Sequence, residues 1–189
     1  MPTPPPTILF KPRTETIIEV ILHLAHKGIP LDRYKLVKLV YLAEITHLNR
    51  YGRFITNDKM VAMKNGPVPS TLYDILCKKK RRGVDYSDMP FDYVTRGDRH
   101  YIENPKRKIK RELFSVSDLE VLDEIFDQYG KSSFGELYDL THEHAGFQRA
   151  WQSRGNRWSK PILVEDLVDE SPHKAEFVDD MRFYCRNVF

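Results

Sequence analysis

The sequence predicts an α+β protein that is predominantly α-helical: a single compact domain of about six or seven helices with one or two small β-hairpins. Three observations lead to this prediction. Apolar residues recur with helical period over most of the chain. Two short extended segments flank the turn residues Arg96-Gly97-Asp98. The chain has 189 residues, of which 41% are hydrophobic and 30% charged, a balance typical of one globular domain with appendages.

The first half of the chain predicts two helices. Residues 17–25 have a helical apolar pattern, and Thr16 and Glu19 have the spacing of a capping box at its start. Pro30 opens the second helix, in which two neighbouring apolar stripes cover most of the circumference until Gly52 ends it. We therefore expect the second helix to be the buried centre of the domain.

A strand, a tight turn and a short helix are predicted next. The strand covers residues 60–64, and the turn falls on Asn65-Gly66-Pro67, because glycine takes a positive φ easily and proline lacks a donor. Ser70 caps the helix that carries Tyr73. The loop 64–68 has two interpretations: a chain reversal between strand and helix, or a rigid loop that shapes a groove beside the Tyr73 helix.

The second half predicts a hairpin and further helices. Residues 91–95 and 99–103 form the hairpin. Trp151 and Trp158 are the expected anchors of the less regular region 144–170, and Ser171-Pro172 starts the last helix. Two capping boxes are expected before amphipathic runs, one of Ser117 with Glu120 and one of Ser133 with Glu136.

The domain organisation has three predicted parts. Residues 1–13 form an extended proline-rich arm, since Pro4 to Pro6 favour polyproline geometry. Residues 14–152 form the domain, and residues 153–189 form a C-terminal extension whose final helix packs on it. The sequence has two cysteines, no signal-peptide apolar core and no long apolar run. We therefore expect a cytoplasmic protein without membrane contact.

Charge is unevenly distributed along the chain. Residues 1–111 contain 22 Lys/Arg and 11 Asp/Glu, whereas residues 112–189 contain 8 and 16. Either the two halves attract each other, or one faces a charged partner. The basic runs 78–82 and 106–111, with aromatic residues between them, could contact nucleic-acid phosphates. Because no nucleic-acid motif accompanies them, a solvated face or a dock for an acidic protein surface is favoured.

No pattern predicts an enzyme, a metal site or a cofactor. His142 and His144 fall on different helix faces, and Cys77 and Cys185 have no C-x-x-C partners, so a zinc site is not expected. Nucleophile-elbow, Walker and dinucleotide motifs are absent. His47 lies on an apolar stripe and is interpreted as a core histidine; a functional His47 would bond near the 64–68 turn.

The order of several motifs resembles the Panacea domain of the SocA-like antitoxin family, over about residues 15–152. The resemblance implies an antitoxin that binds a cognate protein toxin and holds it inactive. Because members are paired with very different toxins, it does not identify the toxin. The motifs are Lys35-Leu36-Val37-Lys38-Leu39-Val40-Tyr41-Leu42-Ala43, His47, Tyr51-Gly52, residues 62–68 ending in Gly66-Pro67-Val68, Tyr73, residues 117–130, Ser133, Leu137, Leu140-Thr141-His142 and Trp151.

We therefore predict a non-enzymatic antitoxin that neutralises its toxin by direct contact, as a homodimer or as a hetero-oligomer with the toxin. The alternatives are a nucleic-acid-binding regulator that uses the basic runs, and a proteolysis adaptor tethered by the arm. Classical operator binding is not expected, because little chain precedes residue 14. Aromatic and cationic anchors dominate protein interfaces, and the predicted contact residues are Arg50, Tyr51, Arg53, Lys64, Asn65, Gly66, Pro67, Tyr73, Lys79 and Arg82.

Overall fold

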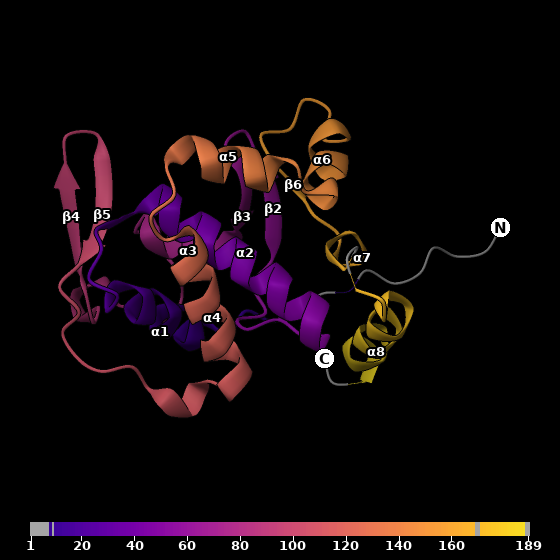
Figure 1. Cartoon of the computed structure of the whole chain (residues 1–189), viewed down its shortest axis with the longest axis horizontal. Helices are drawn as coiled ribbons and strands as arrows, with labels where there is room; N and C mark the ends of the chain where they lie inside the picture. Colours follow the sequence, from indigo (N-terminus) through magenta and orange to yellow (C-terminus); the bar gives the residue numbers. More distant parts are fainter. Residues whose placement is uncertain (1–7, 9, 169–170, 188–189) are drawn as a thin grey trace.

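A computed structural model describes residue 8, residues 10–168 and residues 171–187. This part of the chain contains eight α-helices and two three-stranded antiparallel sheets, which confirms the predicted fold class (Figure 1). The helices are α1 (Thr14–Ala25), α2 (Arg33–Tyr51), α3 (Ser70–Leu76), α4 (Val116–Tyr129), α5 (Phe134–His142), α6 (Ala145–Gln152), α7 (Val164–Leu167) and α8 (Lys174–Asn187). The strands are β1 (Leu31–Asp32), β2 (Met60–Met63), β3 (Gly66–Pro69), β4 (Asp92–Arg96), β5 (Arg99–Glu103) and β6 (Lys160–Pro161). Residues 1–7, most of the predicted arm, lie outside the described residues.

The helix α2 is the centre of the molecule, as the sequence predicts, and α1, α4 and α5 pack around it (Figure 1). It starts at Arg33 rather than at Pro30, because the Asp32 carboxylate accepts a hydrogen bond from the Lys35 amide at 2.8 Å and caps the first turn. Gly52, with φ 68°, ends it in the left-handed conformation.

The strands form two separate sheets. In one, the predicted β4–β5 hairpin is confirmed and β1 pairs with β5. In the other, β2 is the centre, with β3 on one side and β6 on the other. The chain reversal at residues 64–65 therefore joins two strands, not a strand and a helix. Two-residue strands such as β1 and β6 are too short for any sequence pattern to predict.

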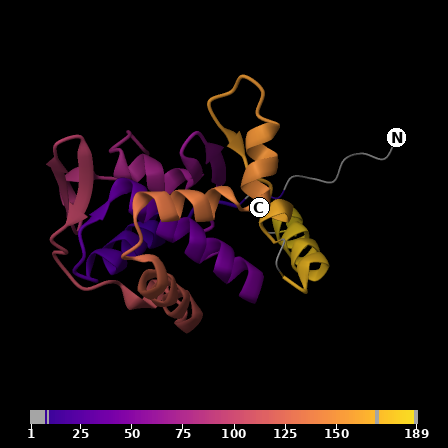
Figure 2. The same cartoon turned by 45° about the horizontal axis from the view of Figure 1, so that its top comes forward.

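Buried apolar residues form two clusters. The larger joins α1, α3 and α4 to the buried side chains of α2 and β5. The smaller surrounds the C-terminal half of α2, where Tyr41 and Leu48 meet α6, α7 and α8. In both views these three helices lie at the end of α2 opposite β4 and β5 (Figure 2). Val178 and Met181 of α8 are buried there. Trp158 is 93% exposed, so its prediction as an anchor is wrong.

Several predicted caps are replaced by other contacts. The N-cap of α1 is Arg13, without a side-chain cap, and Glu19 binds Arg107 instead of closing a box with Thr16. The predicted box of Ser133 and Glu136 is confirmed. The box of α4 lies two residues earlier than predicted and uses Ser115 and Asp118.

The start of α3 is capped from outside its own helix. Ser70 is the first helical residue, and its N-cap Pro69 offers no side-chain acceptor. The Asp58 carboxylate instead accepts hydrogen bonds from the amides of Thr71 and Leu72, both at 2.9 Å. This replaces the cap expected from Ser70 and fixes the loop before β2 to α3.

None of the described helices has the length and hydrophobicity that a bilayer span requires.

Candidate functional site

A groove of about 470 Å³ opens at the N-terminal end of α2. Its walls come from α2, the β2–β3 hairpin, α3, the β4–β5 turn and the start of α5. The volume falls within the range of small-molecule sites. The groove therefore assembles residues from five segments of the chain, among them Arg33, Lys38, Lys64, Tyr73, Arg99 and Phe134.

Lys38 is the buried cation of this groove. Its side chain is fully buried, and its Nζ donates a hydrogen bond to the Pro67 carbonyl oxygen at 2.9 Å. The Nζ also lies 5.1 Å from the centre of the Tyr34 ring. Within the described residues, no carboxylate lies within ion-pair distance of it. Burial lowers the pKa of Lys38 to about 7.

The turn before β3 passes very close to Lys38. Gly66 has φ 98°, and a Cβ there would lie 2.5 Å from Lys38 Nζ and 2.8 Å from His142 Cε1. Only glycine allows both this conformation and this approach. The exposed residues Lys64 and Asn65 line the groove, so the loop reverses the chain and also shapes a groove beside Tyr73.

Aromatic residues cover Lys38 on the side of α5. The ring of Tyr34 packs on Phe134 with centroids 4.2 Å apart, and Phe134 is 55% exposed. Among the described residues, the buried Tyr34 hydroxyl has no hydrogen-bond partner. Burial, and then the nearby Tyr138 and Asp139, raise the pKa of Tyr34, so this phenol remains a donor.

The remaining predicted contacts near the groove belong to α3 and the basic run that follows. Tyr73 lies between two cations, 5.8 Å from the Arg33 guanidinium and 5.2 Å from Lys79 Nζ. Lys79 also pairs with Asp74 at 2.9 Å. Arg82 is exposed and lies outside the groove wall.

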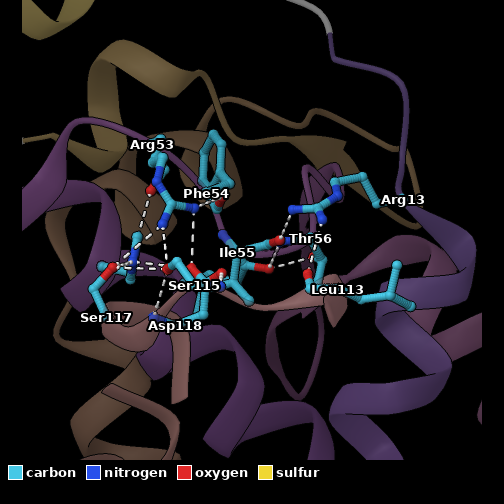
Figure 3. Close-up of polar contacts among 11 residues, drawn as sticks. Arg13, Arg53, Phe54, Ile55, Thr56, Leu113, Ser115, Ser117 and Asp118 are labelled. Atoms are coloured by element: carbon cyan, nitrogen blue, oxygen red, sulfur yellow. Dashed lines mark hydrogen bonds and ion pairs between the residues drawn. The ribbon is translucent and has the colours of Figure 1, made fainter. Parts of the chain in front are cut away.

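Arg50, Tyr51 and Arg53 lie at the other end of α2, away from the groove. The Arg50 guanidinium binds both oxygens of Glu124, at 2.5 and 2.6 Å. Arg53 donates to Ser115 Oγ at 2.7 Å and pairs with Asp118 at 3.0 Å (Figure 3). The two arginines therefore join the end of α2 to α4, and the predicted contact residues fall into two separate groups.

His47 is a core histidine, as predicted. It is fully buried; its Nδ1 lies 2.9 Å from the Arg53 carbonyl oxygen, and its Nε2 lies 3.1 Å from both Ser117 Oγ and Asp118 Oδ1. No contact with the 64–68 turn is formed. Serine and aspartate approach the same ring nitrogen here, whereas in a catalytic triad they occupy opposite nitrogens. The arrangement therefore supports the fold and is not a nucleophile–base pair.

The sequence did not predict the hydrogen bonds of two residues near this end of α2, the buried Glu44 and the exposed Arg13. The Glu44 carboxylate accepts hydrogen bonds from the Ile55 and Thr56 amides, at 2.8 and 2.9 Å, and from the Thr56 hydroxyl. Arg13 donates to the carbonyl oxygens of Ile55 and Leu113, at 3.1 and 2.9 Å (Figure 3). The one sequence feature that indicates these contacts is Glu44, a charged residue inside an apolar helix.

The pKa values of the two buried carboxyl groups at this end of α2 depend on burial and on their hydrogen-bond donors. Burial raises the pKa of Glu44 to about 7, although its three hydrogen bonds oppose the shift. Burial acts in the same direction on Asp118, but the hydrogen bonds from His47 and from the Ser115 amide prevail and lower its pKa to about 2. Both carboxylates are thus held by specific donors.

Comparison with protein families identifies the domain. The family described as "Antitoxin SocA-like, Panacea domain" matches residues 36–151. The chain belongs to this family. The match runs from the first turn of α2 into α6 and contains Lys38, Gly66 and Tyr73. Comparisons with curated proteins and with solved structures give no match.

The basic runs of this Panacea domain are partly neutralised by its own carboxylates. Lys106 pairs with Asp92 at 2.8 Å, and Lys110 pairs with Glu15 at 2.6 Å. Three further pairs join the basic half of the chain to the acidic half, which fits attraction between the halves: Lys27 with Asp123, Arg50 with Glu124, and Arg53 with Asp118.

Among the residues that the structure describes, no three His, Cys, Asp or Glu side chains are grouped as metal ligands.

Proposed function

We propose that this protein is an antitoxin that binds a cognate protein toxin directly and keeps it inactive, without a catalytic step. Membership of the SocA-like antitoxin family carries this proposal. The cytoplasm is the proposed compartment, since a toxin must be held where it would act. A contact of ordinary size buries about 1,600 Å² in total and is dominated by a few tyrosine and arginine anchors.

The rim of the groove is the proposed contact surface. Lys64, Asn65 and Arg99 are exposed there, beside the half-buried Tyr73. Charges on a rim steer association and select the partner more than they add affinity. At the other end of α2, by contrast, Arg50 is already engaged by Glu124. The groove rim therefore supports recognition of an acidic patch on the toxin better than the α2–α4 junction does.

Co-expression with the product of the neighbouring gene tests the function. We expect that product alone to stop growth, and the wild-type protein to restore it. The rim variant Lys64→Glu with Arg99→Glu should lose at least about tenfold in toxin affinity, because like charges now face each other across the contact. It should therefore fail to restore growth at equal expression.

A double variant with the same charge change provides the control. Lys108 and Arg111 are exposed and lie outside the groove, so Lys108→Glu with Arg111→Glu should neutralise as well as the wild type. A neighbouring product that is harmless alone, or that stays lethal with the wild-type protein, contradicts the antitoxin function. Equal rescue by the two double variants contradicts only the contact surface.

A further inference from the structure

The groove contains two buried donors with too few acceptors. An ammonium carries three N–H donors, and the Pro67 carbonyl is the one acceptor found for Lys38 in the described part of the chain. The Tyr34 hydroxyl, buried beside it, has none there. Buried polar groups are nearly always paired in native proteins, and a buried cation usually has a counter-charge. His142, which lies beside Lys38 at Gly66, also has a buried ring nitrogen, Nε2, without a partner among the described residues, so neither donor bonds to it. Both donors therefore point to an acceptor supplied from outside the chain.

The charges around these two donors favour an anion. Arg33, Lys64 and Arg99 line the same groove, together with the carboxylates of Asp32 and Asp98. Asp32 accepts the Lys35 amide as the cap of α2 and lies 3.9 Å from Arg99. Four cationic side chains, including Lys38, thus stand against two carboxylates. The groove therefore has a cationic excess, with Lys38 as its buried member.

The aromatic walls favour a ligand that also has a flat or apolar part. Tyr73 and Phe134 both line the groove, and Phe134 is largely exposed although it lies against Tyr34. The Tyr34 ring, which packs on Phe134, lies over Lys38. Both donors are buried, so an oxyanion reaches them only when this ring pair moves aside, and the ring of a ligand would then lie against Phe134.

We propose that the groove binds a small organic anion, whose carboxylate or phosphate accepts hydrogen bonds from the Lys38 ammonium and the Tyr34 hydroxyl while its flat part lies on Phe134 and Tyr73. Charge-assisted hydrogen bonds of this kind are the strong ones. The oxyanion supplies both the missing acceptor and the missing counter-charge. The proposal does not rest on the antitoxin function, since it follows from the groove alone, although the ligand would share the groove rim with the proposed toxin contact.

Titration calorimetry on the purified full chain tests this proposal with three probes: benzoate, phenyl phosphate and the neutral benzamide. We expect at least one of the two anions to bind one site with a Kd of about 1 mM or below, the affinity expected of so small a ligand. Comparison of benzoate with phenyl phosphate separates a carboxylate site from a phosphate site. Benzamide should bind at least about tenfold more weakly, because it lacks the charge.

Two variants and a control assign the site. Lys38→Met should weaken anion binding at least about tenfold, and Tyr34→Phe about threefold to tenfold. Lys35→Met is the control: Lys35 lies one turn earlier on α2, its Nζ donates to the Gly130 carbonyl at 3.1 Å, and it does not line the groove. Its affinity for the probes should equal that of the wild type.

The proposal is overturned by three results: no saturable binding of either anion up to about 10 mM, equal binding of benzamide, or equal weakening by Lys35→Met. Circular dichroism on each variant checks that it is folded. If Lys38→Met does not fold, Tyr34→Phe decides alone, because removal of one hydroxyl keeps the shape of the groove.

Discussion

The two ends of α2 hold their buried polar groups in opposite ways. At the C-terminal end, Glu44 and His47 meet specific partners on the 53–56 loop and on α4. At the N-terminal end, Lys38 has one acceptor and the Tyr34 hydroxyl has none in the described residues. A fully paired network stabilises a unique fold, whereas an incompletely paired one costs stability and is typical of a functional site. The difference distinguishes the scaffold from the candidate site within one helix.

The largest expected effect is at the paired end. Glu44→Ala leaves the buried amides of Ile55 and Thr56 without an acceptor and opens a cavity. We expect it to lower the free energy of unfolding by about 3–5 kcal/mol. For a chain of this length that corresponds to a fall in Tm of roughly 10 °C. Urea unfolding followed by circular dichroism measures the change.

Glu124→Ala is the matched control for this comparison. Glu124 also binds at this end of the helix, through both nitrogens of Arg50, but its side chain is 45% exposed. An exposed ion pair contributes less than about 1 kcal/mol. If the two alanine variants lose the same stability, the buried network is not what holds the C-terminal end together.

A smaller effect is expected where the chain approaches the incompletely paired end. Gly66→Ala places a Cβ 2.5 Å from Lys38 Nζ at a positive φ. Together, the backbone strain and the displacement of a buried lysine should lower the free energy of unfolding by about 1–3 kcal/mol. Thermal unfolding measures this loss. Gly97→Ala also has a positive φ, of 61°, but meets nothing within 4 Å, so it should cost no more than about 1 kcal/mol. Equal losses would show that the contact with Lys38 is unimportant.

Features encoded by neighbouring residues could be predicted from the sequence. The buried central helix, the β4–β5 hairpin and the box of Ser133 with Glu136 depend on patterns within one element, and all are present. The box of α4 was misplaced by two residues, because Ser115 and Ser117 both precede an acidic residue at the same spacing. Local pattern alone does not choose between them.

Contacts between distant segments could not be predicted. Glu19 and Arg107 are 88 positions apart, and Asp58 caps α3 from an earlier loop. No local pattern selects such partners, so the sequence predicts for Glu19 a cap that it does not form. The groove is also formed by contacts between distant segments. Lys64, Asn65 and Tyr73 were predicted as contacts, but Lys38 and Tyr34 acquire their importance only when five segments meet around them.

The smallest expected effect concerns Lys38 itself, and its sign depends on pH. The pKa of Lys38 is lowered to about 7 in the folded state, against about 10.4 in an unfolded chain. Between these values the unfolded state holds the additional proton, so this residue makes stability rise as pH rises from about 7 to 10. Below about pH 7 both states are charged, and the folded protein carries the full cost of a buried cation that faces Tyr34 on its own helix and His142 from α5, with no carboxylate in ion-pair contact among the described residues.

Lys38→Met should therefore increase the free energy of unfolding by about 1 kcal/mol at pH 6, since an apolar side chain of similar length replaces a buried charge. At pH 9.5 the gain should vanish or reverse, because the neutral amine still bonds Pro67. The raised pKa of Glu44 makes stability fall as pH rises towards 7. Glu44 is present in both the wild type and Lys38→Met, so its contribution cancels when their free energies of unfolding are subtracted. Urea unfolding of both proteins at the two pH values measures that difference. A difference that does not change with pH would show that Lys38 is as well solvated as the residues of the rim, and the contrast between the two ends of α2 would then fail.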